Sequence, residues 1–125
     1  LALTTSLGYA QSTYQLSSHV LDVTTGLPAQ QIPIKLERLE EQSGKWVMVD
    51  EKKTDENGRI SNFLPKNTNT KGIYRLTFIV ADYFSSKKIE SFYPFIEVVF
   101  QIKDDKHYHV PITLSPFGYS TYRGN

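Results

Sequence analysis

The chain has no cysteine, almost no net charge and no long apolar run. Zero cysteines among 125 residues exclude disulfide bonds, thiolate catalysis and cysteine-bearing zinc sites. A formal net charge of +1 gives no electrostatic reason to expect nucleic acid or an anionic membrane as a partner. No segment is long and apolar enough to span a bilayer. The length therefore predicts a single soluble domain.

The first ten residues differ in composition from the rest. Leu1–Ala10 carries no charge and ends in small residues before the polar pair Gln11-Ser12. Small residues ahead of a polar break are typical of a signal-peptide cleavage site. We therefore expect residues 1–13 to be a signal-peptide remnant and the protein to be periplasmic. The alternative is a disordered extension on a cytoplasmic protein; in both cases the domain comprises residues 14–125.

Hydrophobic residues recur mostly with period two. The 8 tyrosines and 7 phenylalanines, together with frequent Val and Ile, favour strands over helices. Alternation predicts strands at 17–21, 32–37, 46–50, 73–80, 95–102 and 107–114, a short one from Arg59 and a last one after Gly118. Asn57-Gly58 is typical of a tight turn with positive φ, and residues 82–90 are expected to hold one short helix. Seven or eight short strands without an internal repeat predict an antiparallel β-sandwich.

The phases of the three histidines place them on the face opposite the core of this sandwich, its outer surface. In segment 107–114 the apolar face consists of Tyr108, Val110, Ile112 and Leu114. His107 and His109 therefore lie on the opposite face, and His19 likewise lies opposite the core residue Val20. The same outer face is predicted to carry Leu21, Pro111 and Thr113. Because this face is not fully polar, we expect it to meet another subunit.

Three motifs resemble those of the transthyretin-like 5-hydroxyisourate hydrolases. Residues 108–125 read YHVPITLSPFGYSTYRGN, which is similar to the C-terminal signature of that family. Residues 17–22, SSHVLD, resemble its N-terminal segment, and residues 54–59, TDENGR, resemble its T-x-x-x-G-R turn. Arg75 and the segment 82–84 also look familial. The resemblance spans about Ser17 to Asn125.

The resemblance implies a fold, an assembly and a reaction. The fold is a transthyretin-like (prealbumin-like) sandwich of two antiparallel sheets with one short helix, assembled as a homotetramer with sites at the dimer–dimer contact. The reaction is hydrolysis of 5-hydroxyisourate to 2-oxo-4-hydroxy-4-carboxy-5-ureidoimidazoline in urate catabolism, without a cofactor. The alternatives are a transthyretin-like module that binds a small ligand without turnover, and an inactive paralogue.

The candidate catalytic residues are His19, Arg59, His109 and Tyr122. His109 is expected to act as the base, and His19 to bind substrate and relay the proton, because neutral imidazole accepts a proton near neutral pH. The permanent cation of Arg59 suits an oxyanion, and Tyr122 is expected to close the pocket and orient the substrate. According to the resemblance, vertebrate transthyretin has unsuited residues at these four positions. The terminal Asn125 departs from the family's usual Ser.

Other chemistries have less support in the sequence. A zinc site would need a third ligand beside His19 and His109, for which His107 is the candidate; we expect no metal. A serine triad lacks a nucleophile motif. Lys87-Lys88 is interpreted as an exposed helix face.

Overall fold

The computed structural model describes residues 13–66 and 69–125, and these form ten strands and one helix. The strands that precede the helix are β1 (Tyr14–Asp22), β2 (Leu27–Pro28), β3 (Pro33–Glu40), β4 (Lys45–Lys53), β5 (Arg59–Pro65) and β6 (Gly72–Phe78). The helix and the later strands are α2 (Ala81–Ser86), β7 (Ile96–Ile102), β8 (Tyr108–His109), β9 (Ile112–Ser115) and β10 (Gly118–Thr121).

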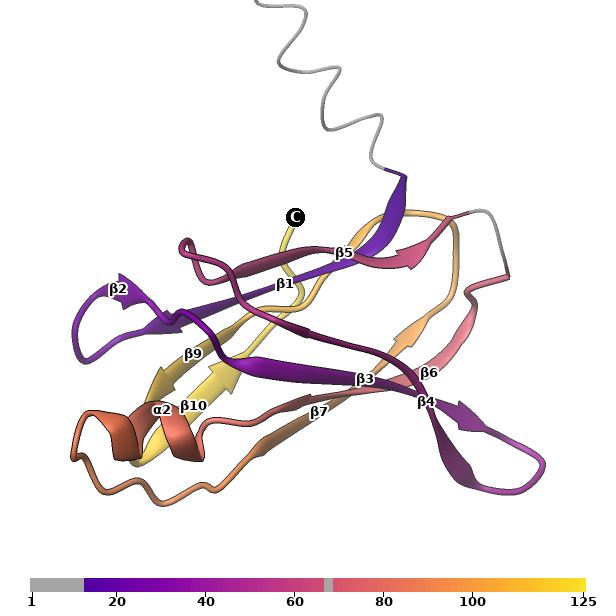
Figure 1. The fold of residues 1–125 in the computed structure, drawn as a ribbon. Coiled ribbons are helices and arrows are strands. Elements are labelled where there is room, and N and C mark those ends of the chain that lie inside the picture. Colours follow the sequence, from indigo (N-terminus) through magenta and orange to yellow (C-terminus); the bar gives the residue numbers. More distant parts are fainter. Residues whose placement is uncertain (1–12, 67–68) are drawn as a thin grey trace, which may run out of the picture.

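Two sheets pack face to face, and α2 lies at one end of them (Figure 1). The four-stranded sheet has the order β4-β3-β6-β7 and is antiparallel throughout. The six-stranded sheet has the order β10-β9-β1-β2, with β5 and β8 also paired to β1. The all-β sandwich with one short helix is thus confirmed for the residues that the structure describes. One detail differs: β1 runs parallel to β8 and β9, so this sheet is mixed rather than antiparallel.

The core lies between the sheets and follows the predicted alternation. One face of β6, continued by the residues after it, is fully buried and carries Tyr74, Leu76, Phe78 and Val80. Val20 on β1 is also fully buried. Each large apolar side chain buried in this way contributes roughly 1.5–3 kcal/mol relative to exposure. The same alternation leaves the other face of β1 toward solvent.

Three local predictions needed correction. The helix ends at Ser86 rather than near residue 90, because Lys88 adopts a left-handed φ of 58°; Lys87 and Lys88 thus lie past the helix. The segment 107–114 is two strands, β8 and β9, interrupted at Val110-Pro111. Pro111 is buried within the chain and so does not offer apolar surface to a partner.

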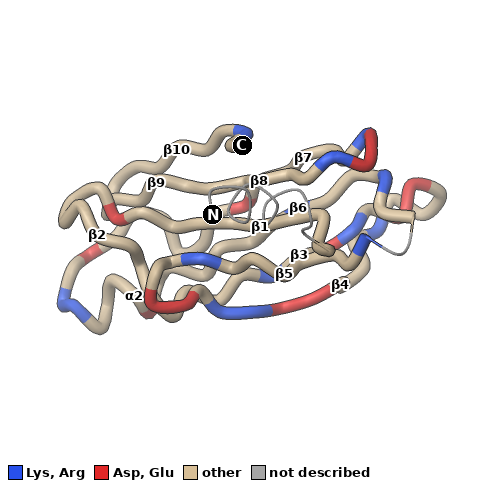
Figure 2. The backbone as a smooth tube through the Cα atoms, turned by 90° about the horizontal axis from the view of Figure 1, so that it is seen from above, with Lys and Arg blue, Asp and Glu red and all other residues tan. Residues whose placement is uncertain are grey.

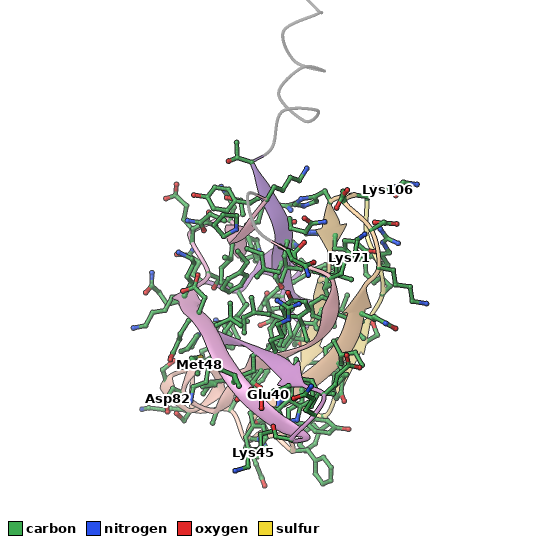
Figure 3. The ribbon with its side chains drawn as sticks, turned by 90° about the vertical axis from the view of Figure 1, so that its right-hand side faces the viewer. Glu40, Lys45, Met48, Lys71, Asp82 and Lys106 are labelled. Carbon is green, nitrogen blue, oxygen red and sulfur yellow. The ribbon has the colours of Figure 1, made fainter. Side chains whose placement is uncertain are left out.

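The two ends of the sandwich differ in content. The end opposite α2 carries the β3–β4 turn with Glu40 and Lys45, and also Lys71 and Lys106 (Figure 3).

No helix among the described residues is long and apolar enough to cross a membrane. Residues 1–12, which hold the expected signal-peptide remnant, lie outside the described residues, so that assignment and the boundary at residue 13 stay predictions.

Candidate active site

The register between β1 and β5 brings His19 next to Arg59. The two residues are direct Cα partners in this antiparallel ladder. Neighbouring strands lie about 4.8 Å apart, and side chains of paired residues stand on the same face of a sheet. His19 is partly buried, whereas Arg59 is exposed on the outer face. A cation and an imidazole predicted from separate motifs are therefore adjacent.

The Asp55–Gly58 turn fixes the start of β5. Asp55 Oδ1 accepts hydrogen bonds from the backbone N–H groups of Asn57 (2.8 Å) and Arg59 (2.9 Å). Gly58 has a φ of +70°, and a Cβ at this position would lie 2.7 Å from the carbonyl oxygen of Val20. Of the predicted pair Asn57-Gly58, only Gly58 adopts a positive φ. The turn needs glycine because both its backbone angle and its close approach to β1 exclude a side chain.

The same turn determines the tautomer of His19. His19 Nε2 lies 3.0 Å from the carbonyl oxygen of Asn57. A carbonyl oxygen only accepts, so Nε2 must carry the hydrogen. Neutral His19 therefore keeps its lone pair on Nδ1, where it can accept a hydrogen bond from a water or a substrate N–H.

His109 joins this face from the other edge of β1. It is the Cα partner of Ser17 in the parallel β1–β8 ladder, and Ser17 lies two residues from His19 on the same face of β1. The C-terminal segment returns beside β8, where the backbone N–H of Gly124 donates to the carbonyl oxygen of His109 (2.8 Å). A Cβ on Gly124 would lie 2.5 Å from His109 Cδ2, so the tail packs directly on the imidazole ring.

Ser17 also links His109 to the third histidine. Ser17 Oγ lies 2.8 Å from His109 Nδ1 and 2.8 Å from His107 Nε2. His107 Nδ1 lies in turn 2.9 Å from the carbonyl oxygen of Tyr14. No motif of the sequence assigns a role to Ser17, although alternation along β1 puts it on the same face as His19.

The electrostatics of the site favour neutral imidazoles. Burial lowers the pKa of His109 below its ordinary value of 6.5, and the positive charges of Arg59, His19 and His107 lower it further, against a backbone hydrogen bond at Ser17 that raises it. Burial and then Arg59 also lower the pKa of His19, while the Asn57 carbonyl and Asp55 oppose the shift. Both rings are therefore available as proton acceptors near neutral pH.

Tyr122 lies in a different part of the surface. It is 58% exposed and lines a cavity of about 360 Å³ together with residues of β7 and with Tyr108, Val110 and Arg123. His19, Arg59 and His109 are not among the residues that line this cavity. Within one chain, Tyr122 is connected to the histidines through the backbone contact of Gly124. Arg123 places its guanidinium 4.0 Å from the centroid of the Tyr108 ring, which holds the chain end against the sheet.

The described residues offer no evident metal centre. In residues 13–66 and 69–125 no group of three or more His, Cys, Asp or Glu side chains is placed to hold a metal ion. His107, the proposed third zinc ligand, has both ring nitrogens within hydrogen-bond distance of Tyr14 and Ser17.

Comparisons with known proteins identify the family of the chain. The family model described as HIUase/Transthyretin family matches residues 16–124. A probable 5-hydroxyisourate hydrolase of Caenorhabditis elegans is 45% identical over 117 residues, which are 93% of this chain and 85% of that protein. The structure of Klebsiella pneumoniae 5-hydroxyisourate hydrolase superposes with a TM-score of 0.76 at 33% identity, covering 88% of this chain and 98% of that one. Sea bream transthyretin in complex with thyroxine superposes with a TM-score of 0.82 at 28% identity, covering 88% and 94%. The chain belongs to the HIUase/Transthyretin family.

Proposed function

We propose that this chain hydrolyses 5-hydroxyisourate to 2-oxo-4-hydroxy-4-carboxy-5-ureidoimidazoline, a step of urate catabolism. The observation that carries the proposal is the convergence of His19, Arg59 and His109 on one outer face of the six-stranded sheet. Relatives with 41–46% identity to this chain bear the name 5-hydroxyisourate hydrolase. The product name itself describes ring opening, since a ring amide becomes a carboxyl group and a ureido group.

His109 is the base that activates water. Its Nδ1 is engaged with Ser17, so Nε2 is the nitrogen left to take a proton. The lowered pKa of His109 keeps that nitrogen unprotonated at neutral pH. A positioned general base of this kind accelerates a reaction by about 10²–10⁴-fold.

Arg59 and His19 act on the substrate. Water adds to the amide carbonyl, and the guanidinium of Arg59 stabilises the oxyanion that develops there. Arg59 suits this task because no carboxylate among the described residues forms a salt bridge with it. His19 accepts a hydrogen bond at Nδ1 and orients the ring, since its Nε2–H is committed to the Asn57 carbonyl.

The proton taken from water completes the reaction. Protonated His109 returns it to the ring nitrogen as the carbon–nitrogen bond breaks, which yields the ureido group and the carboxyl group. Base and acid are thus the same residue in two successive steps, and no metal or organic cofactor takes part.

A binding module without turnover is the second candidate function. Sea bream transthyretin, a structural neighbour, was solved in complex with thyroxine. The fold cannot separate the two functions, because related folds host both. Two neutral imidazoles beside an unpaired guanidinium favour hydrolysis, since simple binding of a ligand does not require proton acceptors.

The assembly proposed is a homotetramer, a dimer of dimers. Residues 110–122, which include β9 and β10, contain no charged side chain, and this region is uncharged in Figure 2. Three large apolar side chains are exposed in β2 and in loops next to strands of this sheet. They are Val23, Leu27 and Phe117, which are 52%, 63% and 68% exposed. A second copy would cover this surface and enclose the site. A second copy also offers a way to bring Tyr122 to the histidines.

A periplasmic location is proposed from the composition of the first ten residues alone.

Turnover of freshly generated 5-hydroxyisourate, followed by ultraviolet absorbance, tests the function. We expect His109→Asn, His19→Asn and Arg59→Ala each to lower kcat/KM by about 10²-fold or more. Sedimentation should show that all three variants keep the oligomeric state of the parent chain. Decay no faster than the spontaneous rate in the parent would favour the binding module. Full activity in all three variants would place the site elsewhere.

A further inference from the structure

A chain of hydrogen bonds runs from a main-chain carbonyl to the proposed base. It begins at the carbonyl oxygen of Tyr14, passes through both ring nitrogens of His107, continues through the hydroxyl of Ser17 and ends at Nδ1 of His109. The three distances are 2.9, 2.8 and 2.8 Å. Neither Ser17 nor His107 reacts in the proposed hydrolysis: Ser17 Oγ contacts His109, and His107 contacts Ser17.

The direction of every hydrogen in this chain follows from its first member. The Tyr14 carbonyl can only accept, so His107 Nδ1 donates, and neutral His107 then has an acceptor at Nε2. Ser17 has one hydroxyl hydrogen, which it must donate to His107 Nε2. Its oxygen consequently accepts from His109 Nδ1.

We propose that Ser17 and His107 are positioning residues that hold neutral His109 as its Nδ1–H tautomer, so that the lone pair on Nε2 faces the water to be activated. The proposal rests on the function proposed above. The opposite tautomer would place two acceptors, His107 Nε2 and His109 Nδ1, against the single hydroxyl hydrogen of Ser17, which can satisfy only one of them. The tautomer is therefore set before substrate binds.

The same arrangement serves the charged intermediate. When Nε2 takes a proton, Nδ1 keeps its hydrogen and its bond to Ser17, so the ring need not turn between the two steps. The titratable or charged groups that act on His109 are Arg59 from β5, His19 from β1 and His107. All three are cationic when charged, and no carboxylate of residues 13–66 and 69–125 takes the orienting role that an aspartate has in a serine-protease triad.

Removing a hydroxyl that only joins β1 to the C-terminal segment should not change the tautomer of His109. The chain contains such a hydroxyl. Ser18, the next residue, donates to the carbonyl oxygen of Val110 (2.8 Å) from the buried face of β1. It ties the same two segments together without contact to an imidazole. Ser18→Ala is thus the matched control for Ser17→Ala.

Nitrogen NMR of the ¹⁵N-histidine-labelled full-length protein reads the tautomer directly. At a pH where His109 is neutral, we expect a protonated-type signal for its Nδ1 and an unprotonated-type signal for its Nε2. In Ser17→Ala the two signals should move toward a mixture, whereas in Ser18→Ala they should not move. A wild-type His109 with the hydrogen on Nε2 would overturn the proposal. Because this spectrum needs no substrate, a failure here differs from a failure of the hydrolase assignment.

Kinetics provide the second measurement. Ser17→Ala should lower kcat by about 10- to 100-fold with little change in KM, as expected for loss of a hydrogen bond that orients a functional histidine. Ser17→Thr keeps the hydroxyl and should recover most of the rate, while Ser18→Ala should stay within about twofold of the parent. Parental kcat in a folded Ser17→Ala protein would contradict the proposal.

A pair of changes at His107 keeps the test informative if Ser17→Ala does not fold. His107→Gln retains an acceptor near the position of Nε2, whereas His107→Phe removes it. The phenylalanine variant should lose as much kcat as Ser17→Ala, and the glutamine variant should lose less. Equal kcat in both variants would overturn the proposed role of His107.

Discussion

The contact between the chain end and the base predicts that Gly124→Ala impairs catalysis more than stability. A Cβ built on Gly124 lies 2.5 Å from His109 Cδ2 and 3.3 Å from Cγ. Carbon atoms not bonded to each other normally approach to about 3.5 Å, so the ring and the tail must separate by about 1 Å. Gly124 does not have the positive φ that would strain alanine. The effect of the substitution is therefore displacement of the imidazole rather than backbone strain.

A displacement of this size is large for a general base. A misplacement of about 1 Å costs on the order of 10²-fold in rate, and we expect kcat to fall by about that factor. The thermal unfolding midpoint should change little, because Gly124 is joined to the sheet by an isolated bridge to His109 and belongs to no strand. The measurements are kcat and KM for 5-hydroxyisourate and the thermal unfolding midpoint of the same preparation.

Gly118→Ala is the matched control, since the nearest atom to its Cβ would be Ser115 Oγ at 3.6 Å, an ordinary contact. Both glycines lie in the C-terminal segment, and both changes add one methyl group. We expect Gly118→Ala to keep parental kcat. If Gly124→Ala also kept parental kcat, the tail would not position His109 and the argument from close packing would be wrong.

Four further predictions concern pH, stability and metals. Because the pKa values of His109 and His19 are lowered, kcat/KM should be constant near neutral pH and fall only below the ordinary value of 6.5. Arg59 lowers both pKa values, so the residual activity of Arg59→Ala should begin to fall at a higher pH than that of the parent. Both histidines bind protons more weakly when folded than when unfolded, so urea titrations should show the free energy of unfolding decreasing as pH falls below 6.5. Thr54→Val removes a buried hydroxyl that makes hydrogen bonds to two backbone groups, and it should lower the free energy of unfolding by about 1–3 kcal/mol. An unchanged urea midpoint would show that these two hydrogen bonds do not stabilise the fold. A chelator should leave turnover unchanged; loss of activity that zinc restores would favour the zinc alternative.

The sequence alone was sufficient for the fold class and for the facing of the strands. Alternation along 73–80 identified the buried residues Tyr74, Leu76, Phe78 and Val80, because a strand between core and solvent needs opposite side chains on its two faces. The same reasoning put His19 and His109 on the outer face. The Thr54–Arg59 motif predicted a tight turn, and Gly58 indeed has a positive φ.

Only the tertiary structure decided which of these residues meet. Local periodicity says which face a side chain occupies, but not its partner on the next strand, and a shift of one residue would move a whole set of side chains to the other face. The β1–β5 ladder contains an irregularity between Leu16 and Ser18, which alternation does not reveal, and beyond it His19 pairs with Arg59. The break at Pro111 and the parallel course of β8 beside β1 were likewise not visible in the pattern.

The role of Ser17 shows the same division most clearly. Its phase was evident from the sequence, yet its neighbours His107 and His109 are 90 and 92 positions away along the chain. A hydroxyl becomes a link between two imidazoles only when strands distant in sequence lie side by side. The sequence determined which chemical groups lie on the outer face, and long-range strand pairing determined which of them share a hydrogen bond, because that pairing depends on the packing of the whole sandwich.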